Sequence, residues 1–185
     1  MYLLFDTETN GLGPAARMAQ LAFILYDENG NILEKYCELI KPDGWKIPKE
    51  QFFIDNNMST ERCEAEGVDG FEAMRAFQEA LKRCQYKVAH NIQFDKGIIN
   101  TELRIRGIEP ALFKYKKECC TMLSTVQFVG ALNKWGKPGK WPNLQELHNK
   151  CFGESFDGAH DALADVEAMG RCFFELKNKH GFYLV

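Results

Sequence analysis

The sequence of 185 residues has no apolar stretch long enough to cross a membrane. Its longest uninterrupted apolar run, Leu21–Tyr26, is far shorter than the roughly 20 residues that a spanning helix needs. The amino terminus also lacks the basic segment followed by an apolar core that marks a secretory signal. We therefore expect a soluble, cytoplasmic protein with no membrane partner.

Disulfide and zinc signals are also missing. The seven cysteines are odd in number and form no C-x-x-C pair, so neither a disulfide framework nor a zinc site is indicated. An excess of positive charge is absent too, because the net charge is -3. Any binding of nucleic acid must therefore come from local basic patches or bound metal rather than from an overall field. The hydrophobic content of 45% suits one compact domain over residues 1–185.

Apolar periodicity predicts a sheet that begins with three consecutive strands. The Asn-Gly pair at 29–30 is a hairpin signal, so these strands should form an antiparallel meander. An irregular polar excursion with one short helix should follow at residues 41–70. The remaining apolar pattern predicts alternating helices and strands. The expected strands are 2–8, 18–26, 32–40, 86–90 and 119–123, and the expected helices are 71–84, 94–105, 143–148 and a long one spanning 163–176.

Two carboxylates at the end of the first strand require an explanation. Asp6 and Glu8 are two positions apart, so a strand places both on the same face. Like charges this close raise each other's pKa unless a cation lies between them. The pair therefore favours a divalent metal site over two solvated acids at a strand end.

Three short motifs contain nearly all the ionisable residues that apolar periodicity does not explain. They are Asp6-Thr7-Glu8, His90-Asn91-Ile92-Gln93-Phe94-Asp95 and His160-Asp161-Ala162-Leu163-Ala164-Asp165. In this order they closely resemble the DnaQ-like 3′ to 5′ exonucleases of the DEDDh type, and Gly67 is a further shared feature. The resemblance spans residues 2 to about 176. It implies an α/β fold of the ribonuclease H-like kind, with a mixed five-stranded sheet flanked by helices.

The resemblance implies a metal-dependent exonuclease that releases 5′-mononucleotides from the 3′ end of single-stranded nucleic acid. Asp6 would bridge two ions, Glu8 and Asp165 would complete one of them, and Asp95 would serve the other. Two such cations would neutralise four carboxylates and accept a phosphodiester. Oxygen ligands without a cluster of cysteine or histidine favour Mg²⁺, with Mn²⁺ as a substitute.

His160 is the expected general base, since imidazole has an unperturbed pKa of about 6.5. On one continuous helix His160 and Asp165 would point about 140° apart. We therefore expect His160 in the loop or first turn before the helix, near Gly158, and Asp165 within the helix. His90 is expected to pack or hydrogen-bond beneath the second motif rather than to bind metal.

Further residues are candidates for substrate contact. The resemblance assigns this role to Thr9, Asn10, Gly11 and Leu12, and to Asn91 and Phe94. A plain turn at Gly11 and a core position for Leu12 are the alternatives. The segment 133–142 alternates cations with Trp135 and Trp141, a pattern suited to single strands, although tryptophans packed on the core would give the same spacing. Trp45, Phe52 and Phe53 are further aromatic candidates.

The motifs leave the polymer open. We favour DNA, as in proofreading or repair, over trimming of RNA, and a DNA polymerase is a candidate partner. A catalytically silent nucleic-acid-binding or polymerase-associated module is an alternative of another class, although the intact set of five residues argues against it. A phosphohydrolase acting on small nucleotides is a third reading, for which a closed pocket would be expected. The sequence is silent on oligomeric state.

Overall fold

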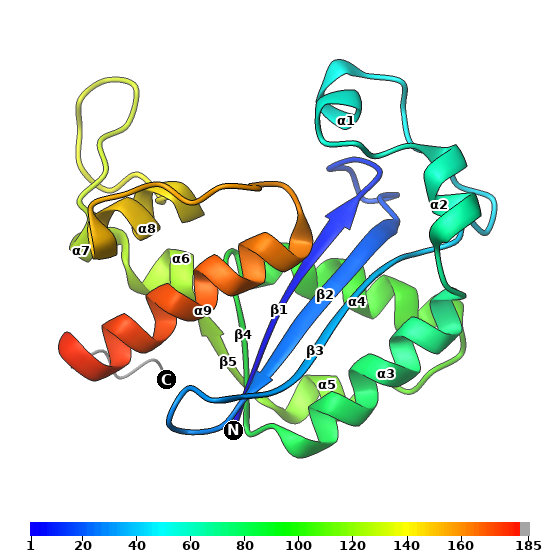
Figure 1. Cartoon of the computed structure of the whole chain (residues 1–185), viewed down its shortest axis with the longest axis horizontal. Coiled ribbons are helices and arrows are strands. Elements are labelled where there is room, and N and C mark those ends of the chain that lie inside the picture. Colours follow the sequence, from blue (N-terminus) through cyan, green and yellow to red (C-terminus); the bar gives the residue numbers. More distant parts are fainter. Residues whose placement is uncertain (182–185) are drawn as a thin grey trace.

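The computed structural model describes residues 1–181, so the last four residues of the expected 1–185 domain lie outside the described residues. Its centre is a five-stranded mixed sheet with the strand order β3-β2-β1-β4-β5 (Figure 1). β1 pairs antiparallel with β2, and β2 antiparallel with β3, whereas β4 runs parallel to β1 and β5 parallel to β4. The predicted α/β fold and mixed sheet are confirmed. The strands are β1 (Tyr2–Thr9), β2 (Met18–Tyr26), β3 (Ile32–Leu39), β4 (Tyr86–Ala89) and β5 (Lys117–Cys120).

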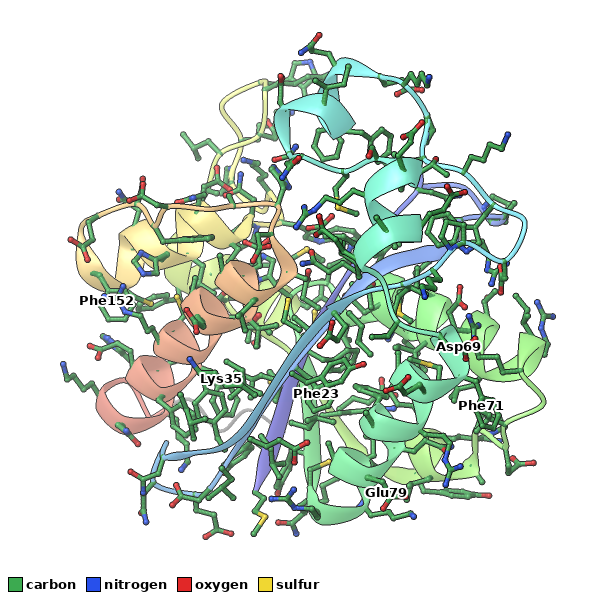
Figure 2. All side chains as sticks on the ribbon, turned by 45° about the vertical axis from the view of Figure 1, so that its right-hand side comes forward. Phe23, Lys35, Asp69, Phe71, Glu79 and Phe152 are labelled. Atoms are coloured by element: carbon green, nitrogen blue, oxygen red, sulfur yellow. The ribbon has the colours of Figure 1, made fainter. Side chains whose placement is uncertain are left out.

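Helices cover both faces of the sheet (Figure 1). One face packs against α3, α4 and α5, and the other against α9. In Figure 2 the ring of Phe23 on β2 lies between the sheet and α3, and Lys35 on β3 extends toward α9, where it pairs with Glu167. The helices are α1 (Gln51–Asp55), α2 (Thr60–Glu66), α3 (Gly70–Arg83), α4 (Ile92–Ile105), α5 (Ala111–Tyr115), α6 (Thr121–Ser124), α7 (Val126–Val129), α8 (Leu144–Phe152) and α9 (Ala162–Lys179).

The alternation of β1 fixes which way its acidic residues point. Leu3 and Phe5 belong to the core beneath α3, α4 and α5, whereas Leu4 belongs to the core beneath α9. Side chains two apart on a strand share a face. Asp6 and Glu8 therefore continue the Leu4 face toward α9, as their spacing predicts.

The excursion at 41–70 differs from the prediction, because it contains α1 and α2 instead of one helix. Both are short and depend on burial of a few side chains, namely Phe53 in α1 and Cys63 in α2. Isolated helices of this length are unstable in water, so propensity alone does not reveal them. Gly67 ends α2 where a side chain would not fit, since a Cβ there would lie 2.4 Å from the carbonyl oxygen of Cys63.

Several predicted boundaries also shift. The helix expected at 94–105 begins at Ile92, after Asn91 in a left-handed conformation. The strand expected at 119–123 occupies Lys117–Cys120, and a helical turn starts at Thr121. The helix expected at 143–148 has the predicted Asn143 cap but continues to Phe152. The described residues contain no helix that could span a membrane.

Candidate active site

The site begins at the carboxyl-terminal end of the central strand β1. Asp6 and Glu8 are partly buried there. Burial raises the pKa of Glu8 to about 8, and the nearby carboxylates of Asp165 and Asp95 add to the shift. Burial likewise raises the pKa of Asp6 well above its usual value, reinforced by Asp95, Glu8 and Asp165. Among residues 1–181 no hydrogen bond reaches the side chain of Asp6 or Glu8, so nothing but protonation or a cation can relieve the repulsion.

Asp95 joins this group from the first turn of α4. It is 2% exposed, and one of its oxygens, Oδ1, accepts hydrogen bonds from the Thr7 amide at 3.0 Å and the Thr7 hydroxyl at 2.8 Å. Burial raises the pKa of Asp95 to about 7, although the hydrogen bonds from Thr7 oppose that shift. Thr7, between the two acidic residues of β1, thus connects the first motif to the second.

The start of α9 supplies the last two residues of the set. Asp161 is the N-cap of α9, and its Oδ1 accepts from the amides of Leu163 and Ala164 at 3.1 Å each. His160 precedes the helix, as predicted, with a left-handed backbone at φ 71°. Its amide donates to Oδ2 of Asp165 at 3.1 Å. Because His160 lies on a turn before the helix, its side chain can point toward the same site as Asp165, which it could not do from within one continuous helix.

The first and third motifs meet in one cluster. Glu8, His160 and Asp165 each offer a ligand atom, and these atoms all lie within 4.8 Å of one another. Burial raises the pKa of Asp165 to about 6, opposed by its contacts with His160. Asp161 adds a fifth negative charge, since it raises the pKa of Asp6, Glu8 and Asp165. A group of carboxylates with raised pKa values and free oxygens fits divalent cations with oxygen ligands.

A cavity of about 650 Å³ opens beside this cluster. One wall is the end of β1 with the segment after it, and the other is the segment that contains α1. The two walls meet at His160, whose ring lies 5.2 Å from that of Phe52, edge to face. The residues around the cavity are Thr7, Glu8, Thr9, Asn10, Gly11, Leu12, Pro48, Glu50, Phe52, Phe53, Phe94 and His160.

The predicted substrate residues after β1 all line this cavity, but they differ in what their side chains do. Leu12 is 88% exposed, so it is not a core residue. The side chain of Asn10 accepts at Oδ1 from the amide of Arg17 in the same loop, and its Nδ2 donates to the carbonyl of Lys46 in the segment before α1. The Thr9 hydroxyl donates to the carbonyl of Gly11 at 2.6 Å. Asn10 and Thr9 thus shape the loop that presents Leu12.

Other predicted residues lie outside this cavity. Phe94 lines it, whereas Asn91, Trp135 and Trp141 do not. Trp135 and Trp141 are 72% and 63% exposed, so the alternative of tryptophans packed on the core is wrong. Figure 1 shows their loop, between α7 and α8, projecting from the body of the molecule.

The structure also tests the predictions for His90 and for the aromatic residues of the 41–70 segment. His90 hydrogen-bonds as expected, with Nδ1 3.0 Å from the Thr121 hydroxyl and Nε2 3.0 Å from the carbonyl oxygen of Pro142. Trp45 is buried in the core and is not part of the cavity lining, unlike Phe52 and Phe53.

Sequence reasoning missed Gln20 and Asp161. Gln20 is the polar residue within the fully buried strand β2, and it lies opposite Glu8 in the sheet. Its Nε2 donates to Oδ2 of Asp161 at 3.3 Å. A lone polar side chain inside an apolar run was the available signal, because buried polar groups need partners.

The mixed sheet and the carboxylate cluster at the end of β1 define a ribonuclease H-like nuclease domain. The sequence profile of the RNase T family, described as exonuclease, matches residues 3–173. The chain therefore belongs to this exonuclease family, among the DnaQ-like 3′ to 5′ exonucleases.

The chain is similar in sequence to domains of much longer proteins. The 3′-5′ exonuclease DinG of Bacillus subtilis is 30% identical over 181 residues, which cover 96% of this chain and 18% of DinG. A PolC-type DNA polymerase III of Streptococcus mutans is 30% identical over 189 residues, 97% of this chain and 12% of the polymerase. This chain therefore spans less than a fifth of either relative.

The fold is shared with a solved nuclease. Escherichia coli Exonuclease I, in a crystal structure with a dT13 oligonucleotide, superposes with a TM-score of 0.81 at 20% identity. The match covers 97% of this chain and 41% of that one. At this identity the likeness is one of fold.

Proposed function

We propose that this chain is a divalent-metal-dependent 3′ to 5′ exonuclease domain that removes 5′-mononucleotides from single-stranded DNA. The observation that supports it is the cluster of Glu8, His160 and Asp165 next to the carboxylates of Asp6 and Asp95, at the edge of a cavity of about 650 Å³. A strand, a loop and two helices supply these groups together.

Asp6, Glu8, Asp95 and Asp165 are the residues that would hold the metal. Their raised pKa values express mutual repulsion and burial, and oxygen ligands favour Mg²⁺, with Mn²⁺ as a substitute. Two bound ions would neutralise this charge and stabilise the charge that develops on the phosphate. Without such ions the site would repel a phosphodiester.

His160 acts as the general base in this proposal. A ring nitrogen of His160 accepts a proton from the attacking water, whose oxygen forms the new bond to phosphorus. The bond between phosphorus and the 3′ oxygen of the preceding nucleotide breaks, that oxygen takes a proton from solvent to become a hydroxyl, and a 5′-mononucleotide leaves. Exposure of His160 on its turn allows the ring to return the proton to solvent after each cycle.

The cavity is suited to the terminal nucleotide. Gly11 and the exposed Leu12 form one side, and Phe52, Phe53 and Phe94 contribute aromatic surface elsewhere. Asn91 lies outside the lining and is proposed to contact the strand beyond the terminal nucleotide. Apolar and aromatic surface accepts any base, which accords with removal of nucleotides without sequence preference.

DNA is the favoured polymer because of what the relatives are. PolC is named as a DNA polymerase, and Exonuclease I was crystallised with a DNA oligonucleotide. By the same reasoning a DNA polymerase is the candidate protein partner. The cytoplasm is the compartment we propose. Residues 1–185 are proposed to form one exonuclease domain.

The loop between α7 and α8 is the proposed contact for the strand outside the cavity. Trp135 and Trp141 are exposed, and the Lys134 ammonium lies 4.5 Å from the centroid of the Trp135 ring. Exposed tryptophans can stack on bases while lysines neutralise phosphates. Leu132, 59% exposed, extends this surface.

The test is incubation of end-labelled single-stranded DNA and RNA with the chain in Mg²⁺ or Mn²⁺. We expect a ladder of mononucleotide steps from the 3′ end, faster on DNA, and none after chelation with EDTA. Asp6→Ala should abolish the ladder, and His160→Ala should slow it strongly while the affinity for Mn²⁺ stays within a few-fold. Internal cuts, or equal activity of Asp6→Ala, would refute the proposal. Faster cleavage of RNA would reassign the polymer.

A further inference from the structure

Gln20 connects the two halves of the carboxylate site. It is 6% exposed on the interior strand β2, directly across from Glu8 in the register of β1 and β2. Its side chain points to the same face as Glu8, because paired residues of adjacent strands share a face. On that face it meets the first turn of α9, which Figure 1 shows beside the carboxyl-terminal half of β1.

Both polar atoms of Gln20 are used on α9. Oε1 accepts a hydrogen bond from the amide of Ala162 at 3.2 Å, and Nε2 donates to Oδ2 of Asp161 at 3.3 Å. Nε2 also lies 3.4 Å from the sulfur of Cys37 on β3. A buried amide with all of these partners is held in one orientation.

These contacts complete the cap of α9. The first amides of a helix have no partner within it and need one from elsewhere. Asp161 serves the amides of Leu163 and Ala164, and Gln20 serves the amide of Ala162. The cap is therefore shared between a residue of the helix and a residue of the sheet.

The shared cap determines where His160 and Asp165 lie. His160 directly precedes Asp161 and has a left-handed backbone conformation. The hydrogen bond from the His160 amide to the Asp165 carboxylate closes this turn. A shift of the cap would move both residues together relative to Glu8. Because the carboxylates of Glu8 and Asp165 must stay within a few ångströms of each other to hold the same ion, a small shift would weaken metal binding.

We propose that Gln20 is a positioning residue that holds the start of α9 against the sheet and so sets the distance between Glu8 and the pair of His160 and Asp165. The proposal rests on the proposed function for its effect on catalysis, but its effect on metal affinity is measured independently. Gln20 acts through Asp161 and Ala162 and does not touch the substrate cavity.

Four variants test this role, with Mn²⁺ affinity measured by calorimetry. Gln20→Met keeps the length and removes both hydrogen bonds. Gln20→Glu keeps the acceptor for Ala162 but places a carboxylate against Asp161. Asp161→Asn keeps an acceptor for the helix amides and offers a donor in place of Oδ2. The double variant Gln20→Glu with Asp161→Asn restores one donor and one acceptor in reversed order.

We expect Gln20→Met to lower Mn²⁺ affinity about tenfold, the range for residues that orient metal ligands. Gln20→Glu should lose at least as much. When Gln20→Glu is added to Asp161→Asn, the Mn²⁺ affinity should fall little further. The effects of the two substitutions on affinity are then non-additive. In nuclease assays, kcat should fall while KM changes less than threefold.

Gln78→Met is the matched control, because it makes the same substitution at a partly exposed glutamine whose Nε2 donates to the carbonyl of Glu109 and not to α9. Its affinity and activity should equal those of the wild type. Wild-type Mn²⁺ affinity in a folded Gln20→Met protein would overturn the proposal. If Gln20→Met does not fold, the double variant Gln20→Glu with Asp161→Asn provides the test. Additive effects of its two substitutions on Mn²⁺ affinity would overturn the proposal. A wild type that binds Mn²⁺ without nuclease activity refutes the proposed function but leaves this comparison intact.

Discussion

Thr7 donates two hydrogen bonds to the same oxygen of Asp95, one from its amide at 3.0 Å and one from its hydroxyl at 2.8 Å. Thr7 lies between Asp6 and Glu8, and its side chain points to the opposite face of β1. The strand therefore uses both faces for one site. Two residues supply carboxylates toward α9, and the residue between them holds the carboxylate that arrives from α4.

Replacing Thr7 by Val removes the hydroxyl donor and keeps the shape. The hydrogen bond from the Thr7 amide to Asp95 remains, so we expect a moderate decrease in metal affinity. Loss of a hydrogen bond to a charged group costs about 1.5–3 kcal/mol, which corresponds to a decrease in Mn²⁺ affinity of roughly tenfold or more at pH 7. Calorimetric titration measures it. Thr125→Val, which removes a buried hydroxyl that donates to the carbonyl of Thr121 within its own turn, should leave the affinity unchanged.

Asp6→Asn should separate stability from function. The substitution removes one of several repelling carboxylates, so the metal-free protein should become more stable at pH 8. About 1 kcal/mol would raise the Tm by about 2–4 °C for a chain of this size. Nuclease activity should fall at least a hundredfold, since the proposed bridging ligand is lost. Asp157→Asn, at an exposed acid, should change neither quantity, and a lower Tm for Asp6→Asn would contradict the repulsion.

The stability of the metal-free protein should depend on pH with a definite sign. The pKa values are raised to about 8 for Glu8, about 7 for Asp95 and about 6 for Asp165, above the values of about 4 in an unfolded chain. Between pH 4 and 8 the folded state therefore binds more protons, and its stability falls as pH rises through this window.

Cations compete with these protons, so stabilisation by Mn²⁺ should be larger at pH 8 than at pH 6. Thermal unfolding in EDTA and in Mn²⁺, at pH values from 5 to 8.5, measures both trends. A Tm in EDTA that rises steadily from pH 5 to 8 would show that the carboxylates are not destabilising one another.

Phe52→Ala should reduce kcat more than it raises KM. The ring of Phe52 lies 5.2 Å from that of His160, and its loss frees the histidine to leave the site. We expect kcat to fall about fivefold, in line with about 1 kcal/mol for an aromatic pair, and Phe52→Tyr to retain activity. Ile54→Ala, on the same helix and 61% exposed, is the control. A rise in KM with unchanged kcat would limit the role of Phe52 to contact with the nucleotide and exclude its role in holding His160.

The double variant Trp135→Ala and Trp141→Ala should weaken binding of long single strands and spare short ones. Stacking on aromatic side chains contributes about 1–3 kcal/mol per base. A dinucleotide occupies only the cavity, so its KM should not change, whereas the Kd of a longer oligonucleotide should rise at least fivefold. Fluorescence anisotropy in Mn²⁺ on a His160→Ala background, where cleavage is strongly slowed, measures binding. Equal affinity for the long strand would exclude the stacking role.

The central elements could be predicted from the sequence because their patterns are local. Leu3, Leu4 and Phe5 are continuous because β1 is covered on both faces, and Asn143 has the predicted cap of α8. The position of His160 also followed from local geometry, since a helix could not direct it and Asp165 at one point.

The remainder depends on contacts between distant segments. The fold of residues 41–70 depends on the packing of Phe53 and Met58 into the core. No local sequence pattern specifies this packing. Gln20 looked like an isolated polar residue, because its partners Asp161 and Ala162 are reached only when α9 docks. The outward position of Trp135 and Trp141 likewise follows from the tertiary path of their loop.

The shared cap of α9 also has a consequence for biosynthesis. Gln20 and Ala162 are 142 positions apart, so their bond closes a loop that contains most of the domain. A nascent chain that has emerged only as far as α8 contains the carboxylates of β1 and α4, but it lacks Asp165 and the proposed general base His160. Docking of α9 is therefore the step that brings His160 and Asp165 to these carboxylates, so the proposed site forms only when the two ends of this long loop have met.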